Sequence, residues 1–265
     1  MSLPHRIRAL PFLVVCLTSS AAAQSAADRV ATGDSLSRLL SPAEALREYE
    51  LAVALDSSSS LARWKASGAS IDVAKQLTSD HDRARRDRLY AVAQRHAEAA
   101  IALDSLDADA HFMLAQALGR LSLTKSGKAR VRYGRRIYDE AARALALDST
   151  HDGAHHVLGA WHAEVERLSG LTRTFAKLFL GGGFLGRADW DSATAHLEQA
   201  VQLRPEYVFH RLELAQIYLD RRRDAAAQDQ LERILTLPNT DVLDWANKEE
   251  AMRLLSRLRE RQSRR

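Results

Sequence analysis

The stretches Val53-Ala54-Leu55-Asp56-Ser57, Ile101-Ala102-Leu103-Asp104-Ser105 and Leu145-Ala146-Leu147-Asp148-Ser149 are three near-copies of one five-residue segment. A fourth copy, Val201-Gln202-Leu203-Arg204-Pro205, has proline where the others have serine. Recurrence at four separate places predicts that each copy ends the second helix of a repeated helical hairpin. The sequence therefore predicts an all-α array of hairpins, an architecture that usually offers a binding surface.

The segment that follows each copy has a signature of its own. Nine residues after the serine or proline at 105, 149 and 205 come Leu114-Ala115, Leu158-Gly159 and Leu214-Ala215, and Ala66 is the equivalent position after Ser57. This spacing resembles the Leu-Gly-x-x-Tyr pattern of tetratricopeptide repeats, in which a small residue lets the paired helix approach closely. We therefore expect a tetratricopeptide-repeat superhelix of helical hairpins.

The repeat period is irregular, since the four copies are 48, 44 and 56 residues apart against about 34 for a standard unit. The excess predicts longer helices or insertions. The longest interval contains Gly181-Gly182-Gly183 and Gly186, which we expect to end one helix before the next begins near Asp189 or Asp191. A phosphate-binding loop is disfavoured, because no strand precedes the glycines and no Gly-Lys-Ser/Thr follows them.

Nearly all of the remaining chain reads as helix, because its prolines at 42, 205 and 238 fall at helix ends. We expect helices near residues 28–40, 42–55, 59–78, 82–103, 107–123, 127–147, 151–179, 190–203, 206–220, 223–236 and 241–260. The last is a lone amphipathic helix, expected to cap the terminal repeat.

The N-terminus has the features of a cleavable export signal. Arg6 and Arg8 precede an apolar run, and three alanines end at Ala23. This predicts a signal peptide over residues 1–23, a tetratricopeptide-repeat domain over 24–262, and a periplasmic or secreted protein. Acylation of Cys16 is the alternative, disfavoured by the bulky Val15 before it. Cleavage would remove the only cysteine, so no disulfide or thiol chemistry is expected.

The charge of the predicted mature chain is close to balanced. Without the leader's two arginines it has 36 basic and 34 acidic residues, a formal charge of +2. The basic clusters at 83–88, 125–136 and 253–265 are interpreted as solvated helix faces or a frayed end. Aromatic residues do not interleave with them as in single-strand binders, so no nucleic-acid partner is expected.

The segment Ala154-His155-His156-Val157-Leu158-Gly159-Ala160-Trp161 resembles the regulator of microtubule dynamics family. The resemblance continues through Ala176-Lys177, the run from Leu197 to Pro205, Ile217-Tyr218 and Leu237-Pro238, and is looser over residues 80–153. It implies a tetratricopeptide domain. Animal members of that family look membrane-anchored at organelle contacts, and one binds and transfers glycerophospholipids through this domain. The export signal and the glycine run depart from the family pattern, so no microtubule role is expected.

Four histidines, His151, His155, His156 and His162, could in principle hold a metal. No carboxylate lies between them in an HExxH arrangement, and His155 and His162 match packing positions of the repeat. We interpret the cluster as structural or surface histidines and expect neither metal nor cofactor. The absence of a Gly-x-Ser-x-Gly elbow and of a mature cysteine leaves no catalytic set, so no enzymatic activity is expected.

In tetratricopeptide repeats the first helix of each hairpin lines the concave face. Side chains two and five residues before and after the leucine position point inward. The best-placed of them, at two before, two after and five after, form three rows. The rows are Trp64, Phe112, His156 and Leu212; Gly68, Gln116, Ala160 and Gln216; and Ile71, Gly119, Ala163 and Leu219. The predicted ligand-binding residues are Trp64, Phe112, Gln116, His156, Ala160, Ala163, Leu212, Gln216 and Leu219. No lysine or arginine falls in these rows, which predicts an apolar groove, unless the insertions fill it.

The sequence thus predicts a non-catalytic exported scaffold that mediates protein–protein interaction with an unidentified protein partner. The alternative is a phospholipid or other apolar ligand carried in the concave groove. A deep apolar tunnel would favour the lipid, and a shallow polar groove would favour a peptide.

Overall fold

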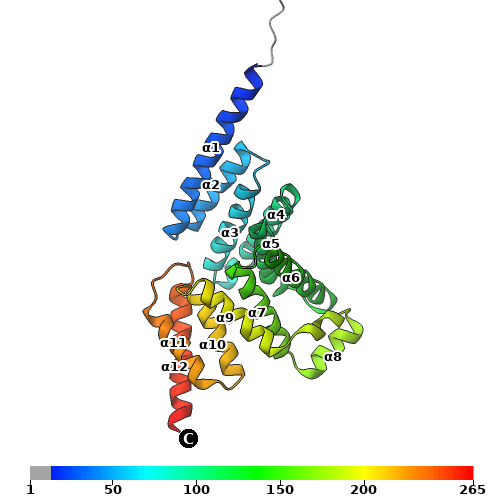
Figure 1. Cartoon of the computed structure of the whole chain (residues 1–265), viewed down its shortest axis with the longest axis vertical. Helices are drawn as coiled ribbons and strands as arrows, with labels where there is room; N and C mark the ends of the chain where they lie inside the picture. Colours follow the sequence, from blue (N-terminus) through cyan, green and yellow to red (C-terminus); the bar gives the residue numbers. More distant parts are fainter. Residues whose placement is uncertain (1–12, 265) are drawn as a thin grey trace, which may run out of the picture.

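The computed structural model describes the backbone of residues 13–264 and the side chains of residues 25–264. In that part of the chain every regular element is helical (Figure 1). The α-helices are α1 (Leu13–Arg38), α2 (Pro42–Leu55), α3 (Ser60–Gln76), α4 (Arg83–Leu103), α5 (Ala108–Ser122), α6 (Gly127–Leu147), α7 (Asp152–Arg167), α8 (Gly170–Phe179), α9 (Trp190–Leu203), α10 (Val208–Asp220), α11 (Asp224–Thr236) and α12 (Asp244–Ser263). Two short 3-10 turns, η1 (Asp80–Asp82) and η2 (Gly183–Arg187), complete the set.

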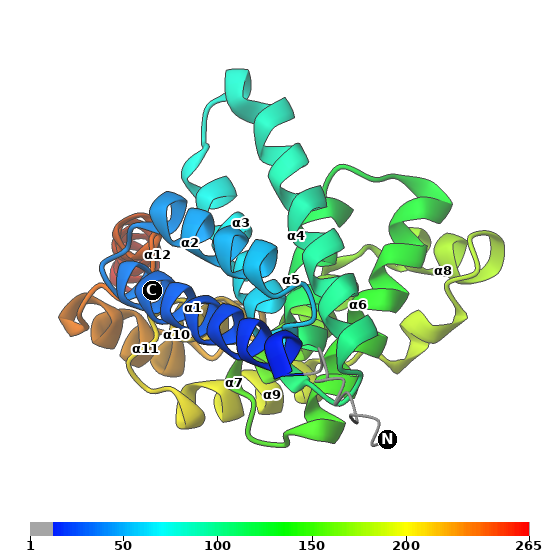
Figure 2. The same cartoon turned by 90° about the horizontal axis from the view of Figure 1, so that it is seen from above.

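The helices pair into five successive hairpins, α1–α2, α3–α4, α5–α6, α7–α9 and α10–α11, with α12 packed on the last as a cap. The first helices of neighbouring hairpins also touch, α3 with α5, α5 with α7, and α7 with α10. Figure 2 shows the hairpins following one another around a curve, with α8 projecting at its outer edge. The predicted tetratricopeptide superhelix with a C-terminal capping helix is therefore confirmed.

The recurring Leu-Asp-Ser segment forms a compact link between hairpins. The aspartates at 56, 104 and 148 end α2, α4 and α6 in an extended conformation, and each carboxylate accepts the backbone N–H two residues on. Three residues after each aspartate, the side chains of Ser59, Asp107 and His151 cap the next helix by accepting an N–H from its first turn. The motif recurs because it ends one helix and begins the next within three residues.

Small residues set the spacing within each hairpin, as the signature predicts. A Cβ placed on Gly159 would lie 1.7 Å from Cδ2 of Leu197, so α9 approaches α7 too closely for any side chain there. The equivalent Ala115 and Ala215 are fully buried. In the second hairpin Ser67 takes this place and donates a 2.9 Å hydrogen bond to the carbonyl of Ala93 on α4.

Two helix predictions differ from the structure. The segment 151–179, expected as one helix, is two, because Leu168 is extended and the Ser169 hydroxyl starts α8 by accepting the N–H of Thr172. Gly181, at φ +74°, then turns the chain out of α8.

At the other end, α1 begins at Leu13 rather than near residue 28 and runs through the predicted cleavage site at Ala23. Residues 1–12, with Arg6 and Arg8, lie outside the described residues, so the signal peptide stays a prediction. From residue 13 to residue 264 no helix combines the length and apolar character needed to cross a bilayer.

Candidate functional site

The predicted concave residues divide by exposure. The middle row is accessible along its whole length, since Gly68, Gln116, Ala160 and Gln216 are all half-buried. Trp64, Phe112 and Leu219 are also half-buried. His156, Ala163 and Leu212 are buried, and the prediction that they line an open groove is wrong.

Ala163 does not face the groove. The residue has no exposed surface and packs with Leu197 of α9 and with Leu214 and Ile217 of α10. At this position α7 therefore faces the next repeat and not the groove, whereas Gly119 and Leu219, at the same offset in α5 and α10, stay half-buried. Ala163 is a core residue of the seam between the last two hairpins.

Side chains two residues before the leucine position also pack between neighbouring hairpins. Phe112 packs on Gly153 and on the ring of His151, whose centroid is 4.7 Å from its own, at the start of α7. His156 contacts Phe209 and His210 at the start of α10 in the same way. These side chains bridge neighbouring first helices, which leaves little of them for a ligand.

Two histidines and a carboxylate join α7 to α10 at His156. Nδ1 of His210 lies 3.0 Å from Nδ1 of His156, and its Nε2 lies 2.9 Å from Asp152. Burial lowers the pKa of His156 well below its ordinary value, and the charges of neighbouring cations lower it further. In the contact between the two Nδ1 atoms one ring donates and the other accepts.

The prediction of an uncharged groove is also wrong. The first helices carry charges that the three rows omit, because those side chains lie six or nine residues after the leucine position, or one residue before it. They are Asp72 and Lys75 of α3, Arg120 of α5, Arg167 of α7, and Glu213 and Asp220 of α10. Counting one further turn along each helix would have found most of them.

Lys75 is the centre of this charged system. Its ammonium donates to Asp72 at 2.8 Å and to Asp241, in the α11–α12 linker, at 3.3 Å, and its side chain is 6% exposed. Tyr207 donates to the same Asp241 carboxylate at 2.9 Å. Burial alone would lower the pKa of Lys75, but the charges of Asp72 and Asp241 outweigh it and raise that pKa. The middle of the concave face is therefore polar.

Glu213 lies farther along the same face. Burial raises the pKa of its carboxyl, and the nearby charges of Arg167 and Arg120 act in the opposite direction. Arg167 is itself held between Glu164 at 2.8 Å and Asp220 at 2.9 Å.

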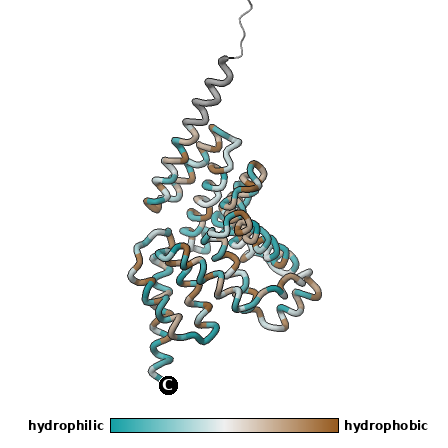
Figure 3. Tube along the Cα trace, viewed as in Figure 1, coloured by the Kyte–Doolittle hydropathy of each residue, from teal (hydrophilic) through white to brown (hydrophobic). Residues whose placement is uncertain are grey.

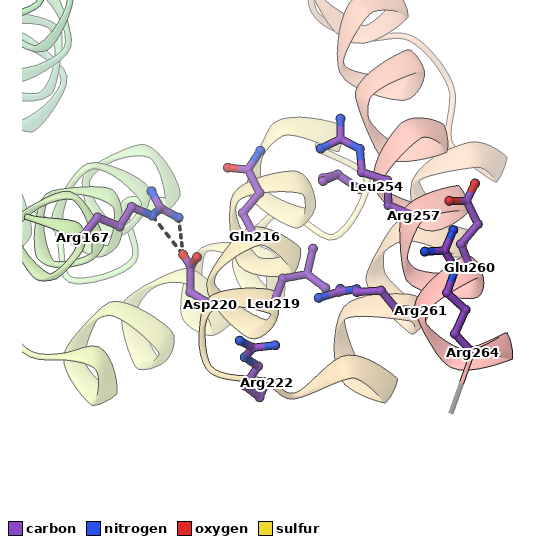
Figure 4. Close-up of a pocket in the computed structure, with 10 residues that line it drawn as sticks. All are labelled: Arg167, Gln216, Leu219, Asp220, Arg222, Leu254, Arg257, Glu260, Arg261 and Arg264. Atoms are coloured by element: carbon purple, nitrogen blue, oxygen red, sulfur yellow. Dashed lines mark hydrogen bonds and ion pairs between the residues drawn. The ribbon is translucent and has the colours of Figure 1, made fainter.

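A cavity of about 760 Å³ opens on this face between α7, α10 and α12 (Figure 4). Its lining is Arg167, Gln216, Leu219, Asp220, Arg222, Leu254, Arg257, Glu260, Arg261 and Arg264. We call it the basic pocket, because five arginines face two acids. Two of the predicted ligand-binding residues, Gln216 and Leu219, belong to it.

Most of the positive charge in the basic pocket is free. Figure 4 shows Arg167 engaged by Asp220. Among the described residues, Arg222, Arg257, Arg261 and Arg264 have no acidic partner within salt-bridge distance. Arg222 is placed at the rim by a left-handed backbone, φ +58°, at the end of α10. This arrangement suits an anionic group that the protein itself does not supply.

A second cavity of about 330 Å³ lies at the other end of the concave face, between α1, α2 and α3. Trp64 and Gly68 of the predicted rows line it. Its one lysine is already paired, since Lys65 donates to Asp34 at 2.7 Å and lies over the Trp64 ring, which leaves Arg38 as its one cation without an acidic partner among the described residues. It is therefore the weaker candidate for binding a charged group.

The histidine cluster has structural roles. His151 caps α7, His155 lies 2.9 Å from His196 of α9 through their Nδ1 atoms, and His162 accepts the N–H of Asp189. In the side chains that the structure describes, no three His, Cys, Asp or Glu residues converge in a way that could hold a metal ion. That the protein needs no metal or cofactor stays a prediction.

Two solved structures share this architecture. A thermophilic tetratricopeptide protein of Thermus thermophilus matches 86% of this chain and 98% of its own, with TM-score 0.62 and 17% identity. The pilF protein of Pseudomonas aeruginosa matches 92% of this chain and all of its own, with TM-score 0.54 and 12% identity. At such identities the likeness shows the fold alone, a tetratricopeptide-type array of helical hairpins.

No curated protein matches the sequence significantly. One family does: residues 25–259 match the family described as regulator of microtubule dynamics protein 1-3, which agrees with the resemblance seen around Ala154–Trp161. The match spans every hairpin and most of the cap. The chain belongs to the regulator of microtubule dynamics protein 1-3 family.

Proposed function

We propose that this chain is an exported, non-catalytic scaffold that binds a partner protein through an acidic segment seated in the basic pocket. The observation that carries the proposal is the group of four arginines at that pocket without an internal acidic partner. The basic pocket lies where the concave face meets the capping helix. A bound segment could therefore extend from it along the half-buried row at Gln216 and Ala160.

The chemistry of the lining fits a peptide carboxylate. Guanidinium groups bind carboxylates through two parallel hydrogen bonds, which gives direction as well as affinity. Leu219 and Leu254 offer apolar contact beside the arginines, and the Gln216 amide can donate to and accept from a peptide backbone. Such a mixture of charged, amide and apolar groups is typical of peptide recognition.

The alternative of an acyl chain in the concave groove has less support. Ala163 and Leu212, meant to line it, are buried in seams between repeats. The Lys75–Asp72–Asp241 system lies in the middle of the concave face, and an acyl chain there would remove water from charges at a cost of several kcal/mol. The basic pocket lies away from these obstacles.

Export rests on the sequence of residues 1–23, and we propose cleavage after Ala23. N-terminal sequencing of the protein recovered from the medium or periplasm should begin at Gln24. A full-length cytoplasmic chain, or an acylated N-terminal Cys16, would contradict export in this form.

Photocross-linking tests the binding site. A photoreactive residue at Leu254, in the basic pocket, should capture a partner protein in the producing cells, and one at the exposed Leu123 should not. Changing Arg257 and Arg261 together to Gln should reduce capture about tenfold or more, because two charge-assisted contacts are lost. The pair Arg85→Gln and Arg88→Gln is the matched control, since it removes the same charge from exposed positions of α4.

Native mass spectrometry of the wild-type protein from its own envelope separates the alternatives. A co-purifying protein whose attachment depends on Arg257 and Arg261 supports the proposal. A co-purifying phospholipid that is retained by the Arg257/Arg261 variant, with no cross-link from position 254, would contradict it and favour the carrier alternative.

A further inference from the structure

Helix α8 exposes an apolar face that no other part of the described chain covers. Leu171, Phe175, Leu178 and Phe179 are 86%, 55%, 71% and 63% exposed. They stand at positions i, i+4, i+7 and i+8, which places them on one side of the helix. Four large apolar side chains together on one short surface helix are unusual for a soluble domain.

The rest of α8 is anchored to the repeat array. Ala176 is buried in a cluster with Trp161 and Val165 of α7 and Ile137 of α6, and Leu180 packs on the same cluster. Arg173 forms an ion pair with Glu166 of α7. The turn η2 closes over this contact, with Phe184 and Leu185 buried. The exposed face is thus held in a fixed orientation at the outer edge of the molecule, where Figure 3 shows apolar residues on the projecting α8 segment.

The surroundings of this face are basic. Residues 168–188 contain Arg173, Lys177 and Arg187 and no acid, and residues 125–136, in the loop before α6 and its first half, contain six lysines and arginines and no acid. The two segments touch, since the guanidinium of Arg135 lies 4.8 Å from the centroid of Phe184. Arg187 also lies 5.9 Å from the ring centroid of Tyr138, two residues beyond the second segment. Arg173 and Arg136 are paired with Glu166 and Glu98, so among the described residues the unpaired cations beside the apolar face are Lys177, Arg187 and the exposed lysines and arginines at the start of α6.

We propose that α8 docks this protein on an anionic membrane surface. Leu171, Phe175, Leu178 and Phe179 would enter the boundary between head groups and acyl chains, while Lys177, Arg187 and the exposed cations of α6 contact anionic head groups. Apolar insertion combined with electrostatic attraction is how amphipathic surface helices bind bilayers, and each contribution alone is weak.

Charge complementarity selects this occupant over a second copy of the chain. In a two-fold symmetric contact through α8 the same basic segments would face each other, because an isologous interface apposes identical patches. Lys128, Arg132 and Arg135, all exposed, would then repel their counterparts at short range. An anionic bilayer turns the same charges into an attraction.

Vesicle flotation tests the proposal with the full chain. Wild type should bind phosphatidylcholine vesicles that contain phosphatidylglycerol and should bind pure phosphatidylcholine vesicles about tenfold less. Phe175→Ser with Phe179→Ser should reduce binding to the anionic vesicles about tenfold or more. Leu39→Ser with Leu106→Ser, two equally exposed leucines outside α8, is the matched control and should bind as wild type does.

The charge contribution is tested by Lys128→Gln with Arg132→Gln against the control pair Arg85→Gln with Arg88→Gln, all exposed positions. Only the α6 pair should weaken binding. All variants have the same N-terminus. Vesicle binding that the α8 substitutions leave unchanged would therefore be attributed to the N-terminal leader, and it would overturn the proposal. Sedimentation equilibrium gives the other contradiction: a dimer that Phe175→Ser with Phe179→Ser dissociates would assign the face to a second copy.

Discussion

Gly159 marks the closest approach between the two helices of one hairpin. A methyl group there would overlap Leu197 and crowd the carbonyl of Ala193 at 3.1 Å. We predict that Gly159→Ala lowers the free energy of unfolding by about 1–3 kcal/mol, because the core must shift to admit it. Urea denaturation followed by circular dichroism measures the change.

Gly119 provides the matched control for that substitution. It lies inside α5, and nothing is within 4 Å of the Cβ it would gain. Gly119→Ala should leave stability unchanged or raise it by about 0.5–1 kcal/mol, since alanine is the better helix former. Equal losses in both variants would show that Gly159 has no special packing role.

Ala163 carries the second prediction at this scale. Because the residue is fully buried against Leu214 and Ile217, Ala163→Glu should unfold the protein or cost about 3 kcal/mol or more. Ala160→Glu, in the half-buried row one turn earlier, should cost less than about 1 kcal/mol. Thermal melts of both variants measure these losses. An Ala163→Glu protein as stable as wild type would show that residue 163 faces the groove.

These residues also show how far the sequence leads at this scale. The small-residue position was predictable because it depends on one helix pair and a fixed spacing. Which side chains face the groove depends on how neighbouring hairpins rotate against each other. That rotation buries Ala163, which no local pattern encodes, whereas Asp72 and Lys75 lie one further turn along α3, where a longer count from the leucine position would have found them.

At the scale of helices, the ends were predictable and the inserted element was not. The Leu-Asp-Ser links use hydrogen bonds within a few residues, so the bounds of α2, α4 and α6 follow from the motif. Helix α8 looked continuous with α7 because both are apolar at helical spacing. The single Ser169 cap separates them and turns the apolar side of α8 outward.

The hairpin α7–α9 contains a pH-sensitive contact, the pair of Nδ1 atoms of His155 and His196. Burial, with the neighbouring imidazoles second, lowers the pKa of His196 from 6.5 to about 4. Between those values the unfolded chain binds a proton that the folded chain does not. The free energy of unfolding should therefore fall as the pH drops from 6.5 towards 4, by at most about 1.4 kcal/mol per pH unit from this residue.

Substitution isolates that contribution from the carboxylates that titrate in the same range. His196→Gln should make the dependence of stability on pH shallower between 6.5 and 4, and His81→Gln, at an exposed histidine of η1, should leave it as in wild type. Denaturation curves at several pH values measure the slope. A slope in His196→Gln as steep as in wild type would remove the residue from the acid response.

At the scale of the whole molecule, Lys75 joins two regions 166 residues apart in the sequence. Helix α3 belongs to the second hairpin, and Asp241 belongs to the linker before the cap. The contact closes the superhelix across its concave side, so the path of the linker depends on a residue near the start of the array. Repeat arrays are normally held by nearest neighbours alone, which is why the sequence did not suggest this closure.

Lys75→Met tests that closure, because methionine keeps the length and the apolar stem of lysine and removes only the charge. Asp72 and Asp241 would then face each other with no cation between them, and removing one partner of a buried ion pair costs about 3 kcal/mol or more. Lys128→Met, at an exposed lysine of α6, should be nearly neutral. Hydrogen exchange should also speed up in the α11–α12 linker of the Lys75 variant, since a strained cap opens before the array unfolds. Exchange there at the wild-type rate, with unchanged stability, would mean that the cap is held by α10 and α11 alone.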